Sequence, residues 1–262
     1  MYSNLILAVT NGVAHLTLNR PEAANGINKE MAEDLDRAAR QCDDDPAVRA
    51  VLLSGNGRFF CAGGDLKAFA SRAENELPSY LEEVTANLHH AVSLFARMRS
   101  PVIAAIHGSA AGAGFSLACA ADFVIAAESA KFTMAYTKAG LTPDGSSTFY
   151  LPRIVGQRRA MELAILNPIL SAKEALDLGI VTRMVADADL MKTATAFAEE
   201  LAVGPTMAYR GVKRLILESS TAGLEDQMGR ETETICGVSS TRDAREGIAA
   251  FVAKRRPNFT GQ

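Results

Sequence analysis

Residues 101–116 read PVIAAIHGSAAGAGFS, and this stretch decides the fold class. The run 102–107 predicts a buried strand, and the small residues of 108–114 predict a tight turn that leads into an apolar helix. The first amide groups of a helix have no partner within it and carry a partial positive charge, so they stabilise a negatively charged oxygen. A strand, a turn of small residues and a helix in this order predict an α/β protein.

A second segment of the same design lies earlier in the chain. Residues 58–67 read RFFCAGGDLK and follow the apolar run 48–54. Two such turns can direct backbone N–H groups at one oxygen atom, which is the arrangement of an oxyanion hole. The alternative is that these glycines only allow close backbone packing. Neither segment matches the glycine motifs of dinucleotide-binding proteins or of P-loop proteins.

The flanking sequence supplies the other elements of an α/β domain. Two apolar runs, 5–10 and 13–19, are separated by Asn11-Gly12, which predicts a β-hairpin. Apolar residues recur at helical spacing after Asn28, which can act as an N-cap, and again over 80–98. Both stretches are therefore expected to be helices. Further strands are expected at 123–126 and 180–185. From about residue 151 the pattern is mainly helical, with helices expected at 158–166, 172–178, 190–201, 206–219 and 224–236.

Composition excludes several classes of protein. The 262 residues include 30 acidic and 27 basic side chains, a net charge of −3 that gives no support to nucleic-acid binding. A compact chain of this size exposes roughly 11,000 Å². The apolar runs fall short of the about 20 residues that cross a membrane, and the first residues lack a secretion signal, so we expect a cytoplasmic protein without membrane contacts. The spacing of Cys42, Cys61, Cys119 and Cys236 predicts free thiols and no metal site.

Several ordered motifs resemble the crotonase (enoyl-CoA hydratase/isomerase) superfamily over nearly the whole chain. They are LNRP at 18–21, CAGGDLK at 61–67, PVIAAI at 101–106 with the glycine-rich 108–114, LPRIVG at 151–156, REGI at 245–248 and FVAKR at 251–255. The resemblance implies a spiral of ββα units over residues 1–203, which binds acyl-CoA thioesters and carries the catalytic site. It implies a C-terminal helical trimerisation region over 204–262, a homotrimer or a hexamer built as a dimer of trimers, and no cofactor beyond the CoA part of the substrate.

The resemblance also assigns expected roles to individual residues. The backbone amides of Gly64 and Ala113 match the oxyanion hole. The expected CoA-binding residues are Ala23, Ala24, Ala62, Asp65, Leu66 and Lys67, together with Phe251 and Lys254, which match residues that contact the CoA of a neighbouring subunit. A solvated, cationic helix end is the alternative for Lys254. We expect the acyl pocket to use apolar residues of 69–94 and Phe149.

The residues at the reacting centre point to isomerisation. Hydratases of the superfamily use two glutamates, and these positions hold Ser116 and Tyr136, which argues against efficient hydration. Asp144, in LTPDG at 141–145, stands where related isomerases carry an aspartate. One carboxylate is enough to move a proton from C2 to C4 of an acyl chain. The segments 130–136, 138–144 and 253–261 are most similar to phenylacetate-pathway ring-epoxide/enoyl-CoA isomerases. The alternative is that Asp144 caps a helix that begins near Gly145.

Two further functions stay open at this point. Aryl-CoA dehalogenases of the superfamily use an aspartate at the Asp144 position as nucleophile and a histidine at the His89 position as base. They support that aspartate with an indole where this chain has Tyr136, and the chain has no tryptophan. A hydratase or lyase that uses Asp144 together with His89 is a related alternative. The simpler interpretation of His89 is that it is a partly exposed helix residue without a catalytic role. The non-enzymatic hypothesis is a protein of the same fold that only binds RNA or a partner, and the net charge gives RNA binding no support.

Overall fold

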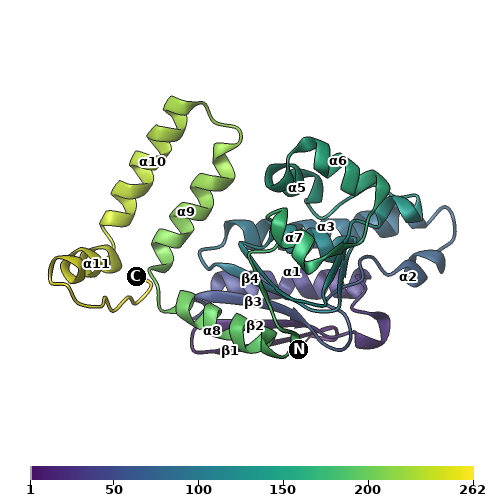
Figure 1. Cartoon of the computed structure of the whole chain (residues 1–262), viewed down its shortest axis with the longest axis horizontal. Helices are drawn as coiled ribbons and strands as arrows, with labels where there is room; N and C mark the ends of the chain where they lie inside the picture. The colour runs from purple at the N-terminus through teal and green to yellow at the C-terminus, as the bar shows by residue number, and fades with distance from the viewer. Residues whose placement is uncertain (1) are drawn as a thin grey trace.

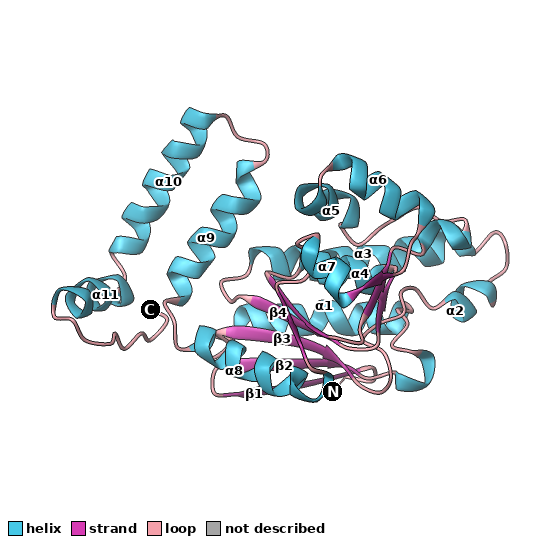
Figure 2. Cartoon of the chain, viewed as in Figure 1, coloured by secondary structure: helices cyan, strands magenta, loops and turns pink. Residues whose placement is uncertain are grey.

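The computed structural model describes residues 2–262, and a six-stranded sheet with the order β1-β2-β3-β4-β6-β9 forms the centre of its α/β body (Figure 2). β1 (Leu5–Thr10) and β2 (Val13–Leu18) form the predicted antiparallel hairpin. Asn11 and Gly12 adopt φ angles of 52° and 77°. Positive φ at both central residues is what a type I′ turn requires, which explains why Asn-Gly closes this hairpin.

The other strands of this sheet run parallel to β2. They are β3 (Ala50–Gly55), β4 (Val102–Ile106), β6 (Phe123–Ala127) and β9 (Arg183–Val185). β4 is buried along its whole length because helices cover both faces of the sheet. α1 (Lys29–Asp44) and α3 (Leu77–Arg97) pack together on one face, and α8 (Leu190–Ala202) lies on the other (Figure 1). The Asn28 side chain caps α1 by accepting from the N–H of Met31, as the sequence predicted.

A second, smaller sheet was not predicted. It has the order β5-β7-β8 and consists of β5 (Ser109–Ala111), β7 (Lys131–Thr133) and β8 (Leu170–Ser171). β5 lies inside the stretch in which the sequence predicted only a turn, and α4 (Ala113–Ala120) begins directly after it. Strands of two or three residues are too short to show an alternating pattern. They form because tertiary contacts align their backbones.

The remaining elements complete the body and a helical extension. They are η1 (Pro21–Ala23), α2 (Leu66–Ala70), η2 (Tyr136–Ala139), α5 (Ser147–Val155), α6 (Gln157–Leu166), α7 (Ala172–Asp177), η3 (Asp187–Asp189), α9 (Thr206–Ser219), α10 (Leu224–Ser239) and α11 (Arg242–Val252). The expected strand at 180–185 is shorter than predicted, since only β9 pairs with its neighbour. No helix within residues 2–262 has the length and apolarity needed to span a membrane.

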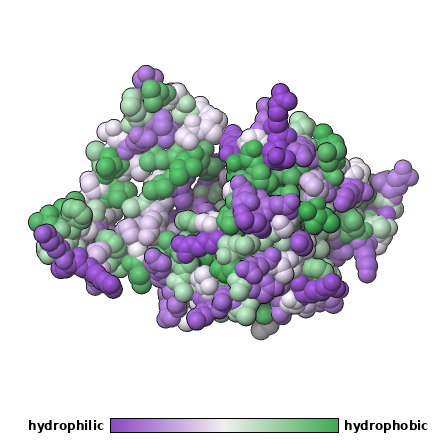
Figure 3. Space-filling model, viewed as in Figure 1, coloured by the Kyte–Doolittle hydropathy of each residue, from purple (hydrophilic) through white to green (hydrophobic). Residues whose placement is uncertain are grey.

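The last three helices extend away from the body, and we call residues 206–252 the helical arm (Figure 1). The chain exposes 13206 Å², more than the roughly 11,000 Å² of a compact protein of this size. Much of the excess is apolar: the arm exposes Ile216, Leu224, Ile235, Ile248, Phe251 and Val252, and apolar patches are visible on it (Figure 3). Exposed apolar surface on this scale is typical of an interaction site.

Arg49 attaches the arm to the body. Its guanidinium donates from Nε to Oγ1 of Thr206 over 3.1 Å and from Nη2 to the carbonyl of Gly204 over 2.6 Å. Nη1 donates to the carbonyl of Phe259 over 3.2 Å, so the same side chain also holds the C-terminal tail. The start of α9 and the tail are therefore fixed to Arg49, the residue that precedes β3.

The four cysteines are free thiols, as predicted, and three of them lie in the core. Cys42, Cys61 and Cys119 are buried, whereas Cys236 is exposed on the arm. Burial raises the pKa of each of the three buried thiols to about 12. They stay protonated at neutral pH and act as small apolar side chains rather than nucleophiles.

Candidate active site

A cavity of about 220 Å³ lies where the two glycine-rich segments meet. Its lining includes Gly64, Ala113, Tyr136 and Asp144, so the structure brings together the proposed oxyanion-hole residues and the expected carboxylate. The rest of the wall is mainly apolar: Ile27, Leu66, Phe69, Leu81, Val84, Thr85, Leu88, Ala135, Ala139, Leu141 and Thr142. A narrow apolar cavity with one ionisable group is suited to an acyl chain and one proton transfer.

Of the residues expected to form the acyl pocket, part of 69–94 lines this cavity, whereas Phe149 does not. Phe149 lines a separate hollow of about 460 Å³ together with His89 and Arg97. Its helix, α5, begins beyond Asp144, and the guanidinium of Arg153 lies over the Phe149 ring, 3.7 Å from its centre. The ring is therefore held on the far side of Asp144 from the acyl cavity.

Backbone contacts hold the two glycine-rich segments together. The N–H of Cys61 donates to the carbonyl of Ser109 over 3.1 Å, and the N–H of Ala111 donates back to Cys61 over 3.0 Å. Gly63 has a φ of 102°, and a Cβ there would lie 3.0 Å from the carbonyl oxygen of Ala111. Glycine is thus required at position 63 for this close approach. The contact agrees with both interpretations of these glycines, close backbone packing and a binding site for an oxygen atom.

The amides of Gly64 and Ala113 are free to bind a ligand. Within residues 2–262 neither N–H donates a hydrogen bond, and both residues line the cavity. Ala113 is the first residue of α4, which follows Gly112 at a φ of 50°. Gly64 lies just before Asp65, the N-cap of α2, so its amide belongs to the loop rather than to the first turn of a helix. Two unpaired amides at a buried site can stabilise an oxyanion.

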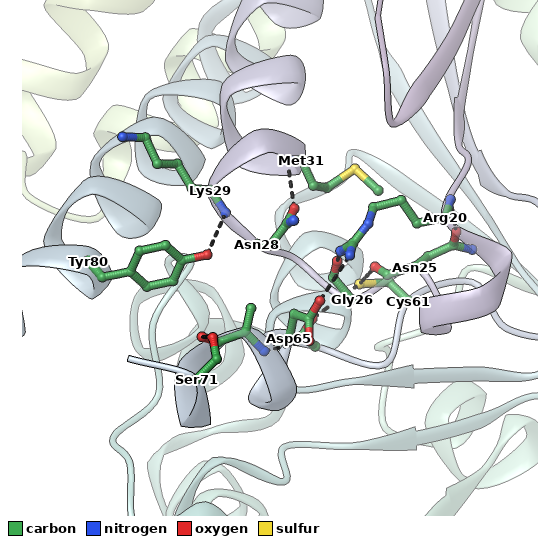
Figure 4. Close-up of polar contacts among 12 residues, drawn as sticks. Arg20, Asn25, Gly26, Asn28, Lys29, Met31, Cys61, Asp65, Ser71 and Tyr80 are labelled. Carbon is green, nitrogen blue, oxygen red and sulfur yellow. Dashed lines mark hydrogen bonds and ion pairs between the residues drawn. The ribbon is translucent and has the colours of Figure 1, made fainter. Parts of the chain in front are cut away.

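Asn25 braces the loop that carries Gly64 (Figure 4). This fully buried residue has a φ of 53°, and its Oδ1 accepts from the N–H of Arg20 over 2.8 Å. Its Nδ2 donates to the carbonyls of Asn56 (2.9 Å), Phe59 (2.8 Å) and Phe60 (3.1 Å). Sequence reasoning missed Asn25. The dipeptide Asn25-Gly26 was the available signal, because asparagine tolerates the left-handed conformation.

The Asp65 carboxylate faces Arg20 rather than the cavity (Figure 4). Arg20 donates from Nη2 to Oδ2 of Asp65 over 3.0 Å, and Oδ1 of Asp65 accepts from the N–H of Ala68 over 3.1 Å. Burial acts to raise the pKa of Asp65, but the Ala68 amide and the Arg20 guanidinium outweigh it and lower that pKa. The side chain of this expected CoA-binding residue therefore stabilises the loop, and its backbone N–H and carbonyl are bonded to Ile27 and Phe69.

Asp144 is held by Tyr136 rather than used as a helix cap. The Tyr136 hydroxyl donates to Oδ1 of Asp144 over 2.5 Å. α5 has Ser146 as its N-cap, with no side chain bonded to its first amides, so the capping alternative for Asp144 is wrong. Burial and the neighbouring Asp144 carboxylate raise the pKa of Tyr136. The phenol stays protonated and acts as a donor.

Ser116 completes a small polar cluster in the buried helix α4. Its Oγ lies 2.8 Å from the Tyr136 hydroxyl and donates to the Asp144 carbonyl over 2.9 Å. The two positions that hold glutamates in hydratases are thus occupied by a linked pair of hydroxyl groups. Neither of these hydroxyls ionises near neutral pH, so Asp144 is the one member of this three-residue cluster that can carry a charge there.

His89 lies near Asp144 but outside the cavity. Its Nε2 accepts from the N–H of Gly145 over 3.1 Å, and the imidazole lines the hollow beyond Asp144. Asp144 lines both the hollow and the cavity. In this arrangement His89 contacts the backbone next to Asp144.

The expected CoA-binding residues fall into two groups. The N–H of Ala62 donates to the carbonyl of Ala24 over 3.0 Å, which places Ala23, Ala24 and Ala62 together beside the cavity, and Leu66 and Lys67 are exposed on α2. Phe251 lies in α11 and Lys254 follows this helix, and α11 is at the opposite side of the molecule from α2 (Figure 1). One chain therefore does not bring these two residues to the cavity.

Comparisons with known proteins agree with this geometry. Residues 8–262 match the family model of enoyl-CoA hydratase/isomerase. The chain is 41% identical to 1,2-epoxyphenylacetyl-CoA isomerase of Escherichia coli (strain K12), over 100% of both chains. It is 33% identical to 4-chlorobenzoyl coenzyme A dehalogenase-2 of Arthrobacter sp, over 94% of this chain and 89% of that protein. A crystal structure of an enoyl-CoA hydratase from Polaromonas sp. JS666 matches 98% of this chain and 99% of its own, with 34% identity and a TM-score of 0.93.

The fold, the paired glycine-rich segments and the C-terminal helices are thus those of the crotonase fold. Matches extend over nearly the whole chain, both in sequence and in structure. The protein belongs to the enoyl-CoA hydratase/isomerase family.

Proposed function

We propose that the protein is an enoyl-CoA isomerase that moves a carbon–carbon double bond from C3 to C2 of an acyl-CoA thioester, or carries out a related isomerisation of a ring-type acyl group. Asp144 breaks the C2–H bond, the electron pair moves onto the thioester carbonyl, and the amides of Gly64 and Ala113 stabilise the enolate oxygen. The proton then forms a bond at C4. No water is added and no redox change occurs.

One observation carries this proposal: Asp144 is the sole carboxylate lining the cavity within the described residues 2–262. Hydration needs one group to activate water and another to deliver a proton, whereas proton relocation needs one group that does both in turn. Ser116 and Tyr136 occupy the two positions where hydratases carry glutamates, and both side chains stay protonated. The likeness to 1,2-epoxyphenylacetyl-CoA isomerase supports an isomerase of acyl-CoA thioesters.

CoA binding and assembly form the second part of the proposal. Backbone groups of Ala23, Ala24 and Ala62 bind the CoA chain, and Lys67 faces a phosphate. Phe251 and Lys254 reach the CoA of a neighbouring copy, because the arm carries them away from the cavity of their own chain. The arm's exposed apolar side chains support a trimer, or a hexamer of two trimers. We assign residues 1–203 to the catalytic core and 204–262 to the assembly region.

Mass spectrometry in heavy water tests the reaction. With 3-hexenoyl-CoA the expected product is 2-hexenoyl-CoA, unchanged in formula apart from exchanged deuterium. The Asp144→Asn variant should lose about 10²- to 10⁴-fold in turnover and keep its affinity for the thioester, because an amide cannot take up the proton. A product heavier by one water, or full turnover in Asp144→Asn, would contradict the proposal.

An aryl-CoA dehalogenase is the second candidate, and the Tyr136–Asp144 hydrogen bond favours it. Dehalogenases support their nucleophilic aspartate with an indole donor, and here the Tyr136 hydroxyl is the donor at that position. Asp144 would displace chloride from the aryl ring, and water would then hydrolyse the aryl ester. Release of chloride from 4-chlorobenzoyl-CoA, with formation of 4-hydroxybenzoyl-CoA, would establish this reaction in place of isomerisation.

A further inference from the structure

We propose that Tyr136 is the positioning residue for Asp144: by holding Oδ1, it presents Oδ2 to the substrate as the atom that takes and returns the proton. This inference rests on the proposed function, in which Asp144 is the base. It assigns a role to a position where hydratases of the family use a glutamate.

The two oxygens of the Asp144 carboxylate have different environments. Oδ1 accepts from the Tyr136 hydroxyl over 2.5 Å. Oδ2 has no hydrogen-bond partner among residues 2–262, although Asp144 lines the cavity. An oxygen that already accepts a short hydrogen bond is a weaker proton acceptor than a free one, so Oδ2 is the basic atom.

Tyr136 is itself fixed at both ends. Its N–H donates to the carbonyl of Met134 over 2.7 Å, and its hydroxyl oxygen lies 2.8 Å from Oγ of Ser116 on the buried helix α4. Its single hydroxyl hydrogen is directed at the carboxylate, and the single Ser116 hydrogen is shared among acceptors that include the Tyr136 hydroxyl oxygen at 2.8 Å and the Asp144 carbonyl at 2.9 Å. A donor that cannot turn away keeps the carboxylate in one rotamer.

The loop bearing Asp144 is also held from the opposite side. The N–H of Gly145 donates to Nε2 of His89 over 3.1 Å, and a Cβ on Gly145 would lie 2.9 Å from Cβ of Ser116. The carboxylate is thus located between a phenol donor on η2 and an imidazole acceptor on α3. A fixed orientation of this kind is what a base needs to reach both C2 and C4 of one substrate.

The ionisable groups around Asp144 are those whose titration can affect the pH profile of the reaction. Tyr136 faces it from η2, His89 and Arg97 come from α3, and α5 contributes Tyr150 to the lining of the adjacent hollow, whereas α4 contributes the neutral Ser116. A carboxylate that loses a donor to its ionised form protonates at a higher pH. Removing the Tyr136 hydroxyl therefore moves the acidic limb of the kcat/KM profile to higher pH.

The experiment compares pH profiles of the full-length oligomer with 3-hexenoyl-CoA. For Tyr136→Phe we expect kcat to fall about tenfold or more, KM to change by less than about twofold, and the acidic limb to move to higher pH. Tyr2→Phe is the matched control, because its hydroxyl bonds only to Gln41 at the surface. His89→Gln separates an imidazole titration from that of the carboxylate.

The outcomes distinguish this inference from the proposed function. An unmoved acidic limb, or a raised KM with unchanged kcat, in folded Tyr136→Phe would overturn the positioning role while leaving Asp144 as the base. Full turnover in Asp144→Asn would overturn the proposed function and this inference with it. If Tyr136→Phe fails to fold, Tyr136→His supplies a second variant with a ring donor: a kcat and an acidic limb close to those of the parent would support the positioning role, and a limb at higher pH would contradict it.

Discussion

Gly114 packs so closely against Cys61 that a Cβ on Gly114 would lie 2.3 Å from the Cys61 carbonyl oxygen. Real side chains do not approach a backbone oxygen to this distance, so the two glycine-rich segments can meet only while residue 114 is glycine. The separation of the Gly64 and Ala113 amides depends on this contact, because each amide belongs to one of the two segments. The proposed oxyanion hole therefore depends on backbone packing.

Gly114→Ala should consequently damage both stability and catalysis. The added methyl group meets the backbone and Cβ of Cys61 on the facing segment, which costs about 1–3 kcal/mol of unfolding free energy. We expect a drop in kcat at the same time, since one amide donor is displaced. Urea unfolding and steady-state kinetics measure the two effects. Gly229→Ala on α10 is the matched control, because nothing lies within 4 Å of its added Cβ. Equal unfolding free energies and equal kcat values in the two variants would show that the contact between Gly114 and Cys61 determines neither property.

Asn25→Ala should lower kcat more than it raises KM. The change removes the donor to three carbonyls, of which the Phe60 carbonyl lies in a buried contact and costs about 1–3 kcal/mol when left unpaired, so the protein is also less stable. The loop that carries Gly64 then loses its brace. Asn87→Ala is a suitable control, because the Asn87 side chain bonds only to a carbonyl one turn earlier in α3. A variant that melts earlier but turns over normally at low temperature would show that Asn25 has no part in positioning the site.

The proposed sharing of sites between subunits predicts complementation. Lys254→Ala should raise KM for the CoA thioester, and Asp144→Asn should abolish turnover, because the two residues serve different steps. When the two variants are unfolded and refolded together, some sites combine an intact Asp144 with an intact Lys254 from the neighbouring copy. We expect activity at low substrate concentration to exceed the sum of the separate variants. No gain on mixing, with mixed oligomers present, would place both residues on one chain's site or remove Lys254 from it.

A buried ion pair anchors the arm and gives a pH-dependent prediction. Nζ of Lys213 on α9 lies 2.6 Å from Oδ2 of Asp122, which also accepts from the N–H of Val102. Burial raises the pKa of Asp122, with the Lys213 charge acting against it, and burial lowers the pKa of Lys213. Taking away the lysine alone leaves a carboxylate that is costly to ionise.

Lys213→Met should therefore be less stable at pH 8 than at pH 5. A carboxyl group whose pKa is raised on folding stabilises the fold in its protonated form, and that stabilisation is lost as the pH rises through the folded-state pKa. Adding Asp122→Asn to Lys213→Met removes the unpaired charge and keeps an acceptor for Val102, so we expect the double variant to be more stable than Lys213→Met at pH 8. Urea unfolding at both pH values measures this difference. A double variant no more stable than the single one would show that the charge is not the cause.

Much of the fold could be predicted because its signals are local. The Asn11-Gly12 turn, the Asn28 cap and the apolar periodicities each depend on residues a few positions apart, and the structure confirms them. The short strands β5, β7 and β8 could not be predicted, because two or three residues carry no periodicity and their pairing depends on chain segments brought together by the rest of the fold.

For the site, the sequence alone determined which residue types are present: two glycine-rich turns, one candidate carboxylate, and Ser116 and Tyr136 in place of glutamates. Only the tertiary structure decided how they meet. It directs the Tyr136 hydroxyl at Asp144 and places His89 against the backbone of Gly145, the residue after Asp144. It turns the Asp65 carboxylate toward Arg20. It also places α11, the helix that leads to Lys254, away from the cavity. The physical reason is that hydrogen-bond direction depends on where a side chain lies in space. A sequence fixes the donor and the acceptor, whereas packing brings them within reach of one another.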